Sequence, residues 1–191
     1  TICNAQITIP KIFGDKMVLQ RGIKIPVWGN ASPGVKVTAK LGNERVTGKA
    51  DKKGKWMLHF SKLKAGGPYV LTVSEAGKPE TTITFQDILV GDVWLASGQS
   101  NMEWEVQQAQ DATNEIAKAD YPHIRFLVVA HNKTLTAQDD ILAGNWKVCD
   151  SINVAKFSAV AYYFSKKIHA DQHVPIGIIQ STWGGTPVES W

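Results

Sequence analysis

The sequence predicts a mixed fold in two parts, an antiparallel β-sandwich followed by a three-layer α/β domain with a parallel sheet. Three observations support this prediction. Residues 1–86 contain short apolar runs separated by turn residues, whereas residues 87–191 alternate long apolar runs with helical patterns. The net charge also changes at this point, from +9 over the first segment to −5 over the second. We therefore expect two domains, residues 1–86 and residues 87–191.

Seven strands are expected in the first domain, because each apolar run is short and is bounded by turn residues such as Gly, Pro and Asn. The runs are KMVLQ, IPVWG, VKVTAKL, RVTGKA, KWMLHF, YVLTVSE and TTITF, at residues 16–20, 25–29, 35–41, 45–50, 55–60, 69–75 and 81–85. A strand about every ten residues, without a helical period, is typical of an antiparallel sandwich such as a jelly roll.

Five elements alternate in the second domain. Residues 88–97 form a nearly continuous apolar run, as expected of a strand that is buried on both faces. The following elements are a helix at 103–119, a strand at 123–130, a helix at 157–170 capped by Ser158, and a strand at 174–180. This order of strands and helices is typical of a parallel sheet.

Composition and charge exclude several classes of protein. Of the 191 residues, 43% are hydrophobic and 20% are charged, which is ordinary for a globular protein. No apolar run reaches the roughly 18 residues of a membrane helix, so we expect no membrane partner. The net charge of +4 comes from lysines scattered through the first domain without interleaved aromatic residues, which argues against nucleic-acid binding. Cys3 and Cys149 have no metal-type spacing, and we expect neither a metal nor a cofactor.

The first residues are similar to the end of a secretory signal. TICNAQ, residues 1–6, places small residues after an apolar one, with a cleavage point expected after Ala5. The charged start and most of the apolar segment of such a signal are not part of this sequence. We expect the protein to be exported to the periplasm or to the outside of the cell.

Two loops of the second domain are candidates for a site. Parallel sheets bind ligands at the carboxyl ends of their strands, and residues 97–102 and 181–186 follow two such ends. Ser100 offers a hydroxyl just before a helix, while Gly184 and Gly185 permit close approach of a substrate. A serine in this place is also a common helix cap, and a Gly-Gly pair is also a common turn. Met102 replaces the second glycine of the G-x-S-x-G elbow, which disfavours a lipase-type hydrolase.

Three ordered blocks resemble the sialate O-acetylesterase family, a branch of the SGNH hydrolases. GDVWLASGQSNMEW, residues 91–104, is similar to the family's nucleophile block, whose hallmark is W-L-x-S-G-Q-S-N-M. Two later blocks, ADYPHIRF and the stretch that begins with FSAVAYYFSKKIH and ends with VPIGIIQSTWGGTPVESW, resemble the corresponding parts of the family in order and spacing. The resemblance begins at about Ile88 and implies that residues 87–191 are the first part of an SGNH-type hydrolase domain. Many bacterial members carry a sandwich ahead of this domain.

The resemblance implies a serine esterase that removes O-acetyl groups from sialic acid or a related acetylated sugar. Ser100 would attack the acetyl carbonyl, and the oxyanion would be held by the Ser100 amide with an amide of Gly184 or Gly185. Gln99 and Asn101 would brace the loop or assist the oxyanion, and Trp104 and Thr186 are further candidates for substrate contact or loop bracing. Trp104, Trp183 and Trp191 would either pack against a sugar ring or be buried under the loops.

The catalytic base of the family is not convincingly present. SGNH enzymes take their His and Asp from a D-x-x-H motif near the end of the domain, and the one such motif in this sequence runs from Asp120 to His123. His123 enters its strand at the amino end, whereas Ser100 follows the carboxyl end of another, so we interpret the motif as a false match. His59, His169 and His173 are expected to be surface or structural residues. We therefore expect the catalytic His and Asp in a C-terminal remainder of the hydrolase or in a second chain.

Two alternatives remain open at the level of sequence. An acetylxylan-type polysaccharide deacetylase would use the same Gln-Ser-Asn core and Gly-Gly loop. A noncatalytic carbohydrate-binding protein, with the sandwich as its working part, would not need Ser100 at all.

Overall fold

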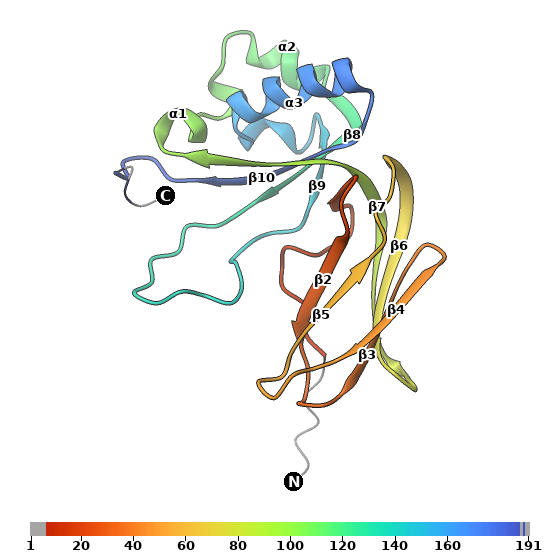
Figure 1. The fold of residues 1–191 in the computed structure, drawn as a ribbon. Coiled ribbons are helices and arrows are strands. Elements are labelled where there is room, and N and C mark those ends of the chain that lie inside the picture. The colour runs from red at the N-terminus through yellow and green to blue at the C-terminus, as the bar shows by residue number, and fades with distance from the viewer. Residues whose placement is uncertain (1–6, 188, 190–191) are drawn as a thin grey trace.

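One large sheet runs through the whole molecule (Figure 1). A computed structural model describes residues 7–187 and 189, so the expected cleavage point at Ala5 and the candidate Trp191 lie outside the described residues. The sheet has eight strands in the order β4-β3-β6-β7-β10-β8-β9, and β1 pairs with β7 beside this path. A second sheet consists of β2 and β5 alone. The chain therefore has the predicted mixed α/β character.

Every strand predicted in the first segment is present. The strands are β1 (Val18–Gln20), β2 (Ile25–Asn30), β3 (Lys36–Leu41), β4 (Glu44–Lys49), β5 (Lys55–Phe60), β6 (Gly66–Glu75) and β7 (Lys78–Gly98). Residues in β2, β3 and β5 alternate between buried and more exposed positions, as their sequence pattern predicts. Their inward side chains form one cluster in which Val27, Leu58 and Val37 are buried. The two-stranded sheet therefore packs against the large one.

Strand β7 passes directly through the predicted domain boundary. It covers 21 residues, and Asp87, at the expected boundary, has a φ of 54° within the strand. The first part of β7 pairs with β6, and residues from Asp92 onward pair with β10. The boundary near residues 86–88 is therefore not a linker, and the division into two domains stays a prediction.

The second segment contains the expected parallel strands and one that the sequence did not suggest. Strand β10 (Ile176–Thr182) lies between β7 and β8 (Asp120–Val128) and is parallel to both. At the outer edge, β9 (Lys147–Asp150) runs antiparallel to β8. The sheet is therefore mixed.

The prediction of one helix over residues 103–119 is wrong, because residues 100–117 form three short helical pieces instead. They are α1 (Ser100–Glu103), the 3-10 turn Val106–Gln108 and α2 (Ala112–Ala117). Trp104 leaves the helical path, and its carbonyl accepts a hydrogen bond of 2.7 Å from the amide of Ala159. A second tertiary bond joins the amide of Val106 to the carbonyl of Phe157 at 2.9 Å. Long-range hydrogen bonds thus replace those of a continuous helix.

The second predicted helix is confirmed as α3 (Ala159–Gln172), after the 3-10 turn Val154–Lys156. The Ser158 side chain caps it by accepting a hydrogen bond from the amide of Ala161 at 3.3 Å. Figure 1 shows that α1, α2 and α3 all lie on the same side of the sheet. In the described part of the chain no helix covers the opposite face, so two of the three predicted layers are present.

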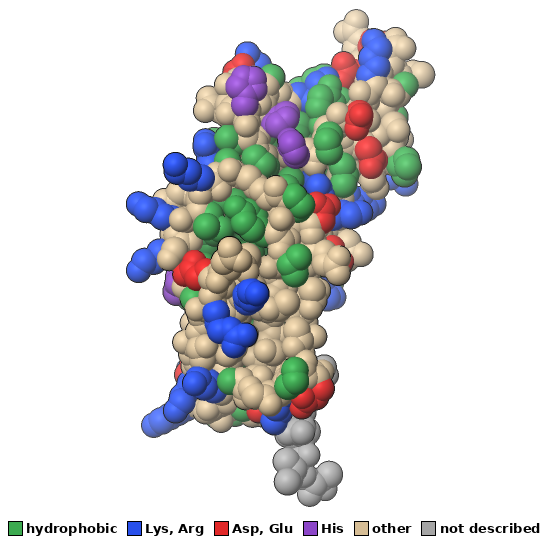
Figure 2. Space-filling view, turned by 90° about the vertical axis from the view of Figure 1, so that its right-hand side faces the viewer, with side chains coloured by type: hydrophobic (Ala, Val, Ile, Leu, Met, Phe, Trp, Pro, Cys, Tyr) green, Lys and Arg blue, Asp and Glu red, His purple; other side chains and the backbone are tan. Residues whose placement is uncertain are grey.

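The surface agrees with the predicted distribution of charge. On the face shown in Figure 2, the Lys and Arg side chains of the lower, N-terminal half are spread out rather than gathered in a single patch. Such a distribution is typical of a solvated surface. Within residues 7–187 and 189, no helix is both long and apolar enough to cross a membrane.

Cys149 offers a test of the packing between β9 and the helices. Its thiol is fully buried and free, and burial raises its pKa to about 12. In a Cys3→Ser variant we therefore expect no reaction of Cys149 with a thiol-directed disulfide reagent at pH 8 in the native state, and one reacting thiol after unfolding in denaturant. Fast labelling of the native variant would contradict the packing described for β9.

Candidate active site

The carboxyl ends of β7 and β10 lie side by side and bring the two predicted loops together. Thr182 of β10 pairs with Gly98 of β7, and the amide of Trp183 donates to the carbonyl of Gly98 at 3.0 Å. The nucleophile loop and the glycine turn therefore leave the sheet at the same point. The rule that sites form at the ends of parallel strands predicted this meeting from sequence.

Ser100 is exposed and is the first residue of α1. The chain reaches it through Gly98, whose φ of 140° is a conformation that other residues rarely adopt. A side chain at Gly98 would also lie 3.0 Å from Cγ of Met102. The Ser100 hydroxyl donates a hydrogen bond of 3.3 Å to Oε1 of Gln99.

Gly184 lies directly against the serine. A Cβ atom added to Gly184 would be 3.5 Å from Oγ of Ser100 and 2.8 Å from Oε2 of Glu103. The Gly184 amide donates a hydrogen bond of 2.5 Å to this same carboxylate oxygen. The turn is closed by Thr186, whose hydroxyl donates to the carbonyl of Trp183 at 2.6 Å. Gly185 follows with a φ of 76° and open space around it.

His131 completes this cluster, although sequence reasoning passed over it. Its Nε2 lies 2.8 Å from the carbonyl oxygen of Thr182 and 3.0 Å from Oε1 of Glu103. Because a carbonyl only accepts, Nε2 carries the proton and donates. His131 follows the end of β8 by three residues. The strand-end rule that singled out Ser100 would also have found it.

The remaining histidines lie elsewhere. Ile124, the residue after His123, pairs with Ile176 of β10, and Ile176 pairs in turn with Asp92 of β7. Six residue steps along β7, from Asp92 to Gly98, span about 20 Å, so His123 is at the far end of the sheet from the serine. There its ring meets that of His169 edge to face, with 5.9 Å between the ring centroids. Within residues 7–187 and 189, no histidine is hydrogen-bonded to the Ser100 hydroxyl.

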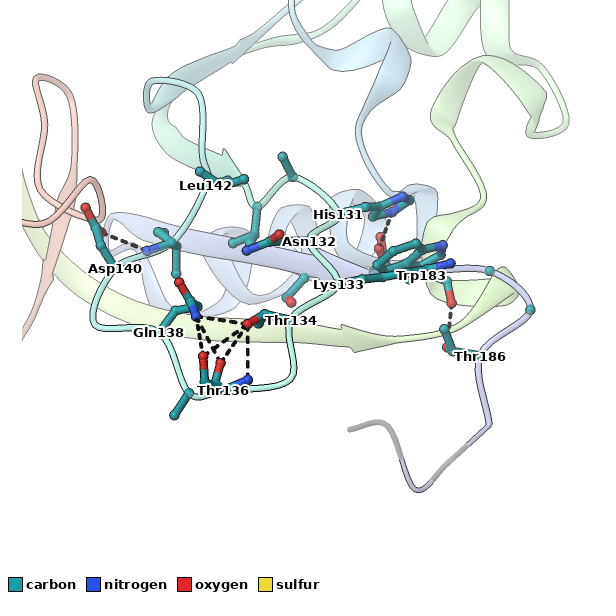
Figure 3. Close-up of a pocket in the computed structure, with 18 residues that line it drawn as sticks. His131, Asn132, Lys133, Thr134, Thr136, Gln138, Asp140, Leu142, Trp183 and Thr186 are labelled. Atoms are coloured by element: carbon teal, nitrogen blue, oxygen red, sulfur yellow. Dashed lines mark hydrogen bonds between the residues drawn. The ribbon is translucent and has the colours of Figure 1, made fainter.

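A hollow of about 880 Å³ opens beside the glycine turn (Figure 3). It lies between residues 129–142, which follow β8, and residues 181–186. In Figure 3 the rings of His131 and Trp183 lie face to face, at 4.2 Å between centroids. Lys133 Nζ lies 5.3 Å from the centroid of the Trp183 ring. Trp183 is therefore held by neighbouring side chains at the wall of the hollow.

Two other candidates lie on or beside the helix that Ser100 begins. Asn101 is exposed on α1, and Trp104, with 51% of its surface exposed, is the C-cap residue after the helix. Within the residues that the structure describes, no group of three or more His, Cys, Asp or Glu side chains is arranged to hold a metal ion. The groups that meet at this site are the Ser100 hydroxyl, the Glu103 carboxylate, the His131 imidazole and the backbone amide of Gly184.

Comparison with known proteins identifies the family. The family model described as carbohydrate esterase, sialic acid-specific acetylesterase, matches residues 90–191. The chain belongs to this family. The sialate O-acetylesterases of Homo sapiens and Mus musculus are 36% and 33% identical to it, over 94% and 86% of the chain. A crystal structure of a carbohydrate acetylesterase from Xanthomonas citri is 40% identical and superposes with a TM-score of 0.92 over 97% of the chain.

These members of the acetylesterase family are much longer than this chain. The chain spans 37% of the human protein, 33% of the mouse protein and 42% of the Xanthomonas protein. The match to the family model includes both the nucleophile loop and the glycine turn. The resemblance inferred from the sequence motifs is thereby confirmed.

Proposed function

We propose that this chain supplies the nucleophile of a carbohydrate O-acetylesterase that removes O-acetyl groups from sialic acids. The observation that carries the proposal is the exposed hydroxyl of Ser100, with Gly184 packed against it at the carboxyl edge of the sheet. In the reaction, the Ser100 oxygen attacks the acetyl carbonyl and the sugar oxygen leaves with a proton. Water then cleaves the acetyl-enzyme to acetate and restores the serine.

The tetrahedral intermediate needs donors for its oxyanion. The amide of Ser100 is one candidate, because the first turn of a helix leaves its amides without intrahelical partners. Of the two amides in the glycine turn, that of Gly184 donates to Glu103. We therefore assign the second donor to Gly185, and each donor is worth about 3 kcal/mol in the transition state.

Activation of Ser100 requires a base from outside the described residues. The hydroxyl is bonded to a neutral amide oxygen of Gln99, and the nearby His131 uses its Nε2 proton toward Thr182 and Glu103. We propose that a further part of the same hydrolase, in the same polypeptide or in a second chain, provides the catalytic His and Asp. The other partner that we propose is the substrate, an O-acetylated sugar.

The free edge of β7 is where we propose that this further part docks. Residues 92–98 of β7 pair with β10 on one edge. On the other edge, the amide of Val93 donates to the side-chain oxygen Oε1 of Gln20, and beyond Val93 no strand of the described residues pairs with β7. Leu95 is 68% exposed on the face that lacks helices, and Trp94 is 44% exposed on the other face. Parallel sheets normally have both of their faces covered. A further parallel strand with its connecting helix would cover this region.

Replacing Leu95 by lysine tests this docking. In the isolated 191-residue chain we expect the free energy of unfolding to change by less than about 0.5 kcal/mol, because the side chain is already exposed. In the protein expressed with whatever polypeptide its gene encodes after residue 191, we expect a loss of about 2 kcal/mol or more, since a lysine would replace a buried leucine. Ile152→Lys, at another exposed apolar position, is the matched control. Equal effects in both forms of the protein would rule out docking at this edge.

We further propose the finer features expected from sequence. The packing of β2 and β5 on the large sheet supports a sandwich-like arrangement for residues 7–86. The order of parallel strands supports an SGNH-type hydrolase fold for the second segment. The small residues around Ala5 support export to the periplasm or the cell exterior. A reporter fusion that begins at the natural start codon would test export. We expect it to be secreted, and to stay inside the cell when the residues up to Ala5 are deleted.

The substrate is tested by comparing acetate release from two polymers and one sugar. The protein expressed with its natural C-terminal continuation is supplied with 9-O-acetyl sialic acid, acetylated xylan and acetylated xyloglucan at equal acetyl concentration. We expect the highest kcat/KM for 9-O-acetyl sialic acid. A plant-polysaccharide deacetylase is the second candidate, because it would use the same Gln-Ser-Asn core and Gly-Gly loop. Glycan binding without any acetate release would favour a noncatalytic protein.

A further inference from the structure

Glu103 connects three segments of the candidate active site. It is the last residue of α1, the helix that Ser100 begins. Its Oε2 accepts the hydrogen bond of 2.5 Å from the amide of Gly184, and its Oε1 lies 3.0 Å from Nε2 of His131. One carboxylate therefore joins the nucleophile helix, the glycine turn and the segment that follows β8.

The space at Gly184 is shaped by this carboxylate. A Cβ atom there would lie only 2.8 Å from Oε2 of Glu103, so any larger residue would displace either the carboxylate or the turn. The same Cβ position is 3.5 Å from the Ser100 oxygen. The contact between Glu103 and Gly184 thus fixes the distance between the turn and the nucleophile.

The second carboxylate oxygen is also held in place. The His131 N–H is shared between Glu103 and the carbonyl of Thr182, the last residue of β10. The imidazole ring stacks on Trp183 with an angle of 4° between the ring planes. Glu103 and His131 have 36% and 42% of their side-chain surface exposed, so both are partly shielded from water. Each oxygen of the carboxylate therefore has a hydrogen-bonding partner that orients it.

We propose that Glu103 is a positioning residue of the esterase reaction, which holds the glycine turn at a fixed distance from Ser100. His131 supports it by fixing the orientation of the carboxylate. The role rests on the proposed function, because a fixed distance matters only if the turn provides an oxyanion donor. The hydrogen-bonding partners of the Glu103 carboxylate are Gly184 and His131, whereas the Ser100 hydroxyl is bonded to Gln99, so Glu103 is assigned no proton transfer.

The first test measures the contact itself in the 191-residue chain. A hydrogen bond to a carboxylate moves an amide proton to lower field, so the Gly184 signal of the 15N-labelled protein is expected at unusually low field. Glu103→Gln keeps the shape of the side chain but removes its charge, and we expect it to shift the Gly184 proton upfield by at least several tenths of a ppm. Glu105→Gln is the control, because the Glu105 carboxylate accepts from Gln107 and lies outside the turn. An unchanged Gly184 signal in Glu103→Gln would overturn the proposal.

The second test measures catalysis by the protein expressed with its natural C-terminal continuation. We expect Glu103→Ala to lower kcat roughly 10- to 100-fold, because small displacements of a catalytic group have effects of this size. KM should change less than about twofold, since the oxyanion donors act in the transition state. Glu103→Gln should recover part of the lost kcat, and Glu105→Gln should retain full activity. An equal rise in KM with unchanged kcat would contradict a positioning role.

The two proposals fail in different ways. If Ser100→Ala leaves acetate release intact, the proposed function is wrong whatever the Gly184 signal does. If Ser100→Ala abolishes the activity but Glu103→Ala leaves kcat unchanged, only the role of Glu103 is wrong. His131→Ala gives a further check, with an expected loss in kcat smaller than that of Glu103→Ala, because Gly184 keeps its carboxylate partner.

Discussion

Replacing Ser100 by alanine is expected to abolish acetate release by the hydrolase that this chain forms together with the proposed further part. The structure places this hydroxyl at the end of β7, exposed and beside the glycine turn. Loss of the serine removes the atom that forms the acetyl-enzyme, and in a serine hydrolase this costs on the order of 10⁶-fold in kcat. Release of acetate from 9-O-acetyl sialic acid is the measurement. The backbone donors and bound substrate geometry would leave at most a small residual rate.

Ser97→Ala is the matched control, because Ser97 is another exposed serine near the end of the same strand. This variant is expected to retain activity within about twofold. Circular dichroism spectra of both variants should match that of the unchanged protein, since neither position is buried. Full activity of Ser100→Ala, or equal losses in both variants, would remove Ser100 from the mechanism.

The isolated 191-residue chain gives a second outcome for the same residue. We expect it to hydrolyse p-nitrophenyl acetate no faster than its own Ser100→Ala variant. The reason is that the Ser100 hydroxyl is bonded to Gln99, an amide that cannot take up its proton. Robust serine-dependent turnover by the chain alone would show that it contains its own base, and His131 would then be the first residue to examine.

The meeting of Ser100 and Gly184 was predictable because it depends on simple geometry. Both residues directly follow strands, and parallel neighbouring strands end at the same edge of a sheet. The strands themselves were predictable because apolar and polar residues alternate along them. Only an extended strand places such apolar residues on one face, where they can be buried. The false D-x-x-H match could be rejected for the same reason, since His123 precedes the buried part of β8.

The features that the sequence did not reveal depend on contacts between distant residues. The break after α1 is stabilised by the hydrogen bond between Trp104 and Ala159, which no local pattern encodes. The bridge from Glu103 to Gly184 joins residues that are 81 positions apart. The continuity of β7 was hidden because a change of charge and of pattern at residue 87 resembles a linker. In each case long-range packing overrode the local signal.

Leu127→Ala is expected to lower the free energy of unfolding of the chain by about 2 to 5 kcal/mol, as for other buried leucines. Leu127 belongs to β8 of the second segment, yet its fully buried side chain lies in the core formed by the first segment. Trp146 joins this same core, and its indole N–H donates to the carbonyl of Ile12 at 2.8 Å. The cavity left by the substitution would therefore weaken both halves of the molecule at once. Unfolding in urea, followed by tryptophan fluorescence and by circular dichroism, is the measurement.

Both signals should move together, because β7 and this shared core connect the two segments. In Leu127→Ala we expect one transition at lower urea concentration, with coincident curves from the two probes. Val128→Ala is the control, since the neighbouring side chain is 40% exposed and its truncation should cost less than about 1 kcal/mol. Two separate transitions, of which the substitution shifted only one, would instead mean that the segments before and after residue 87 unfold independently. Strand β7 would then connect two units that fold independently, instead of belonging to a single cooperative folding unit.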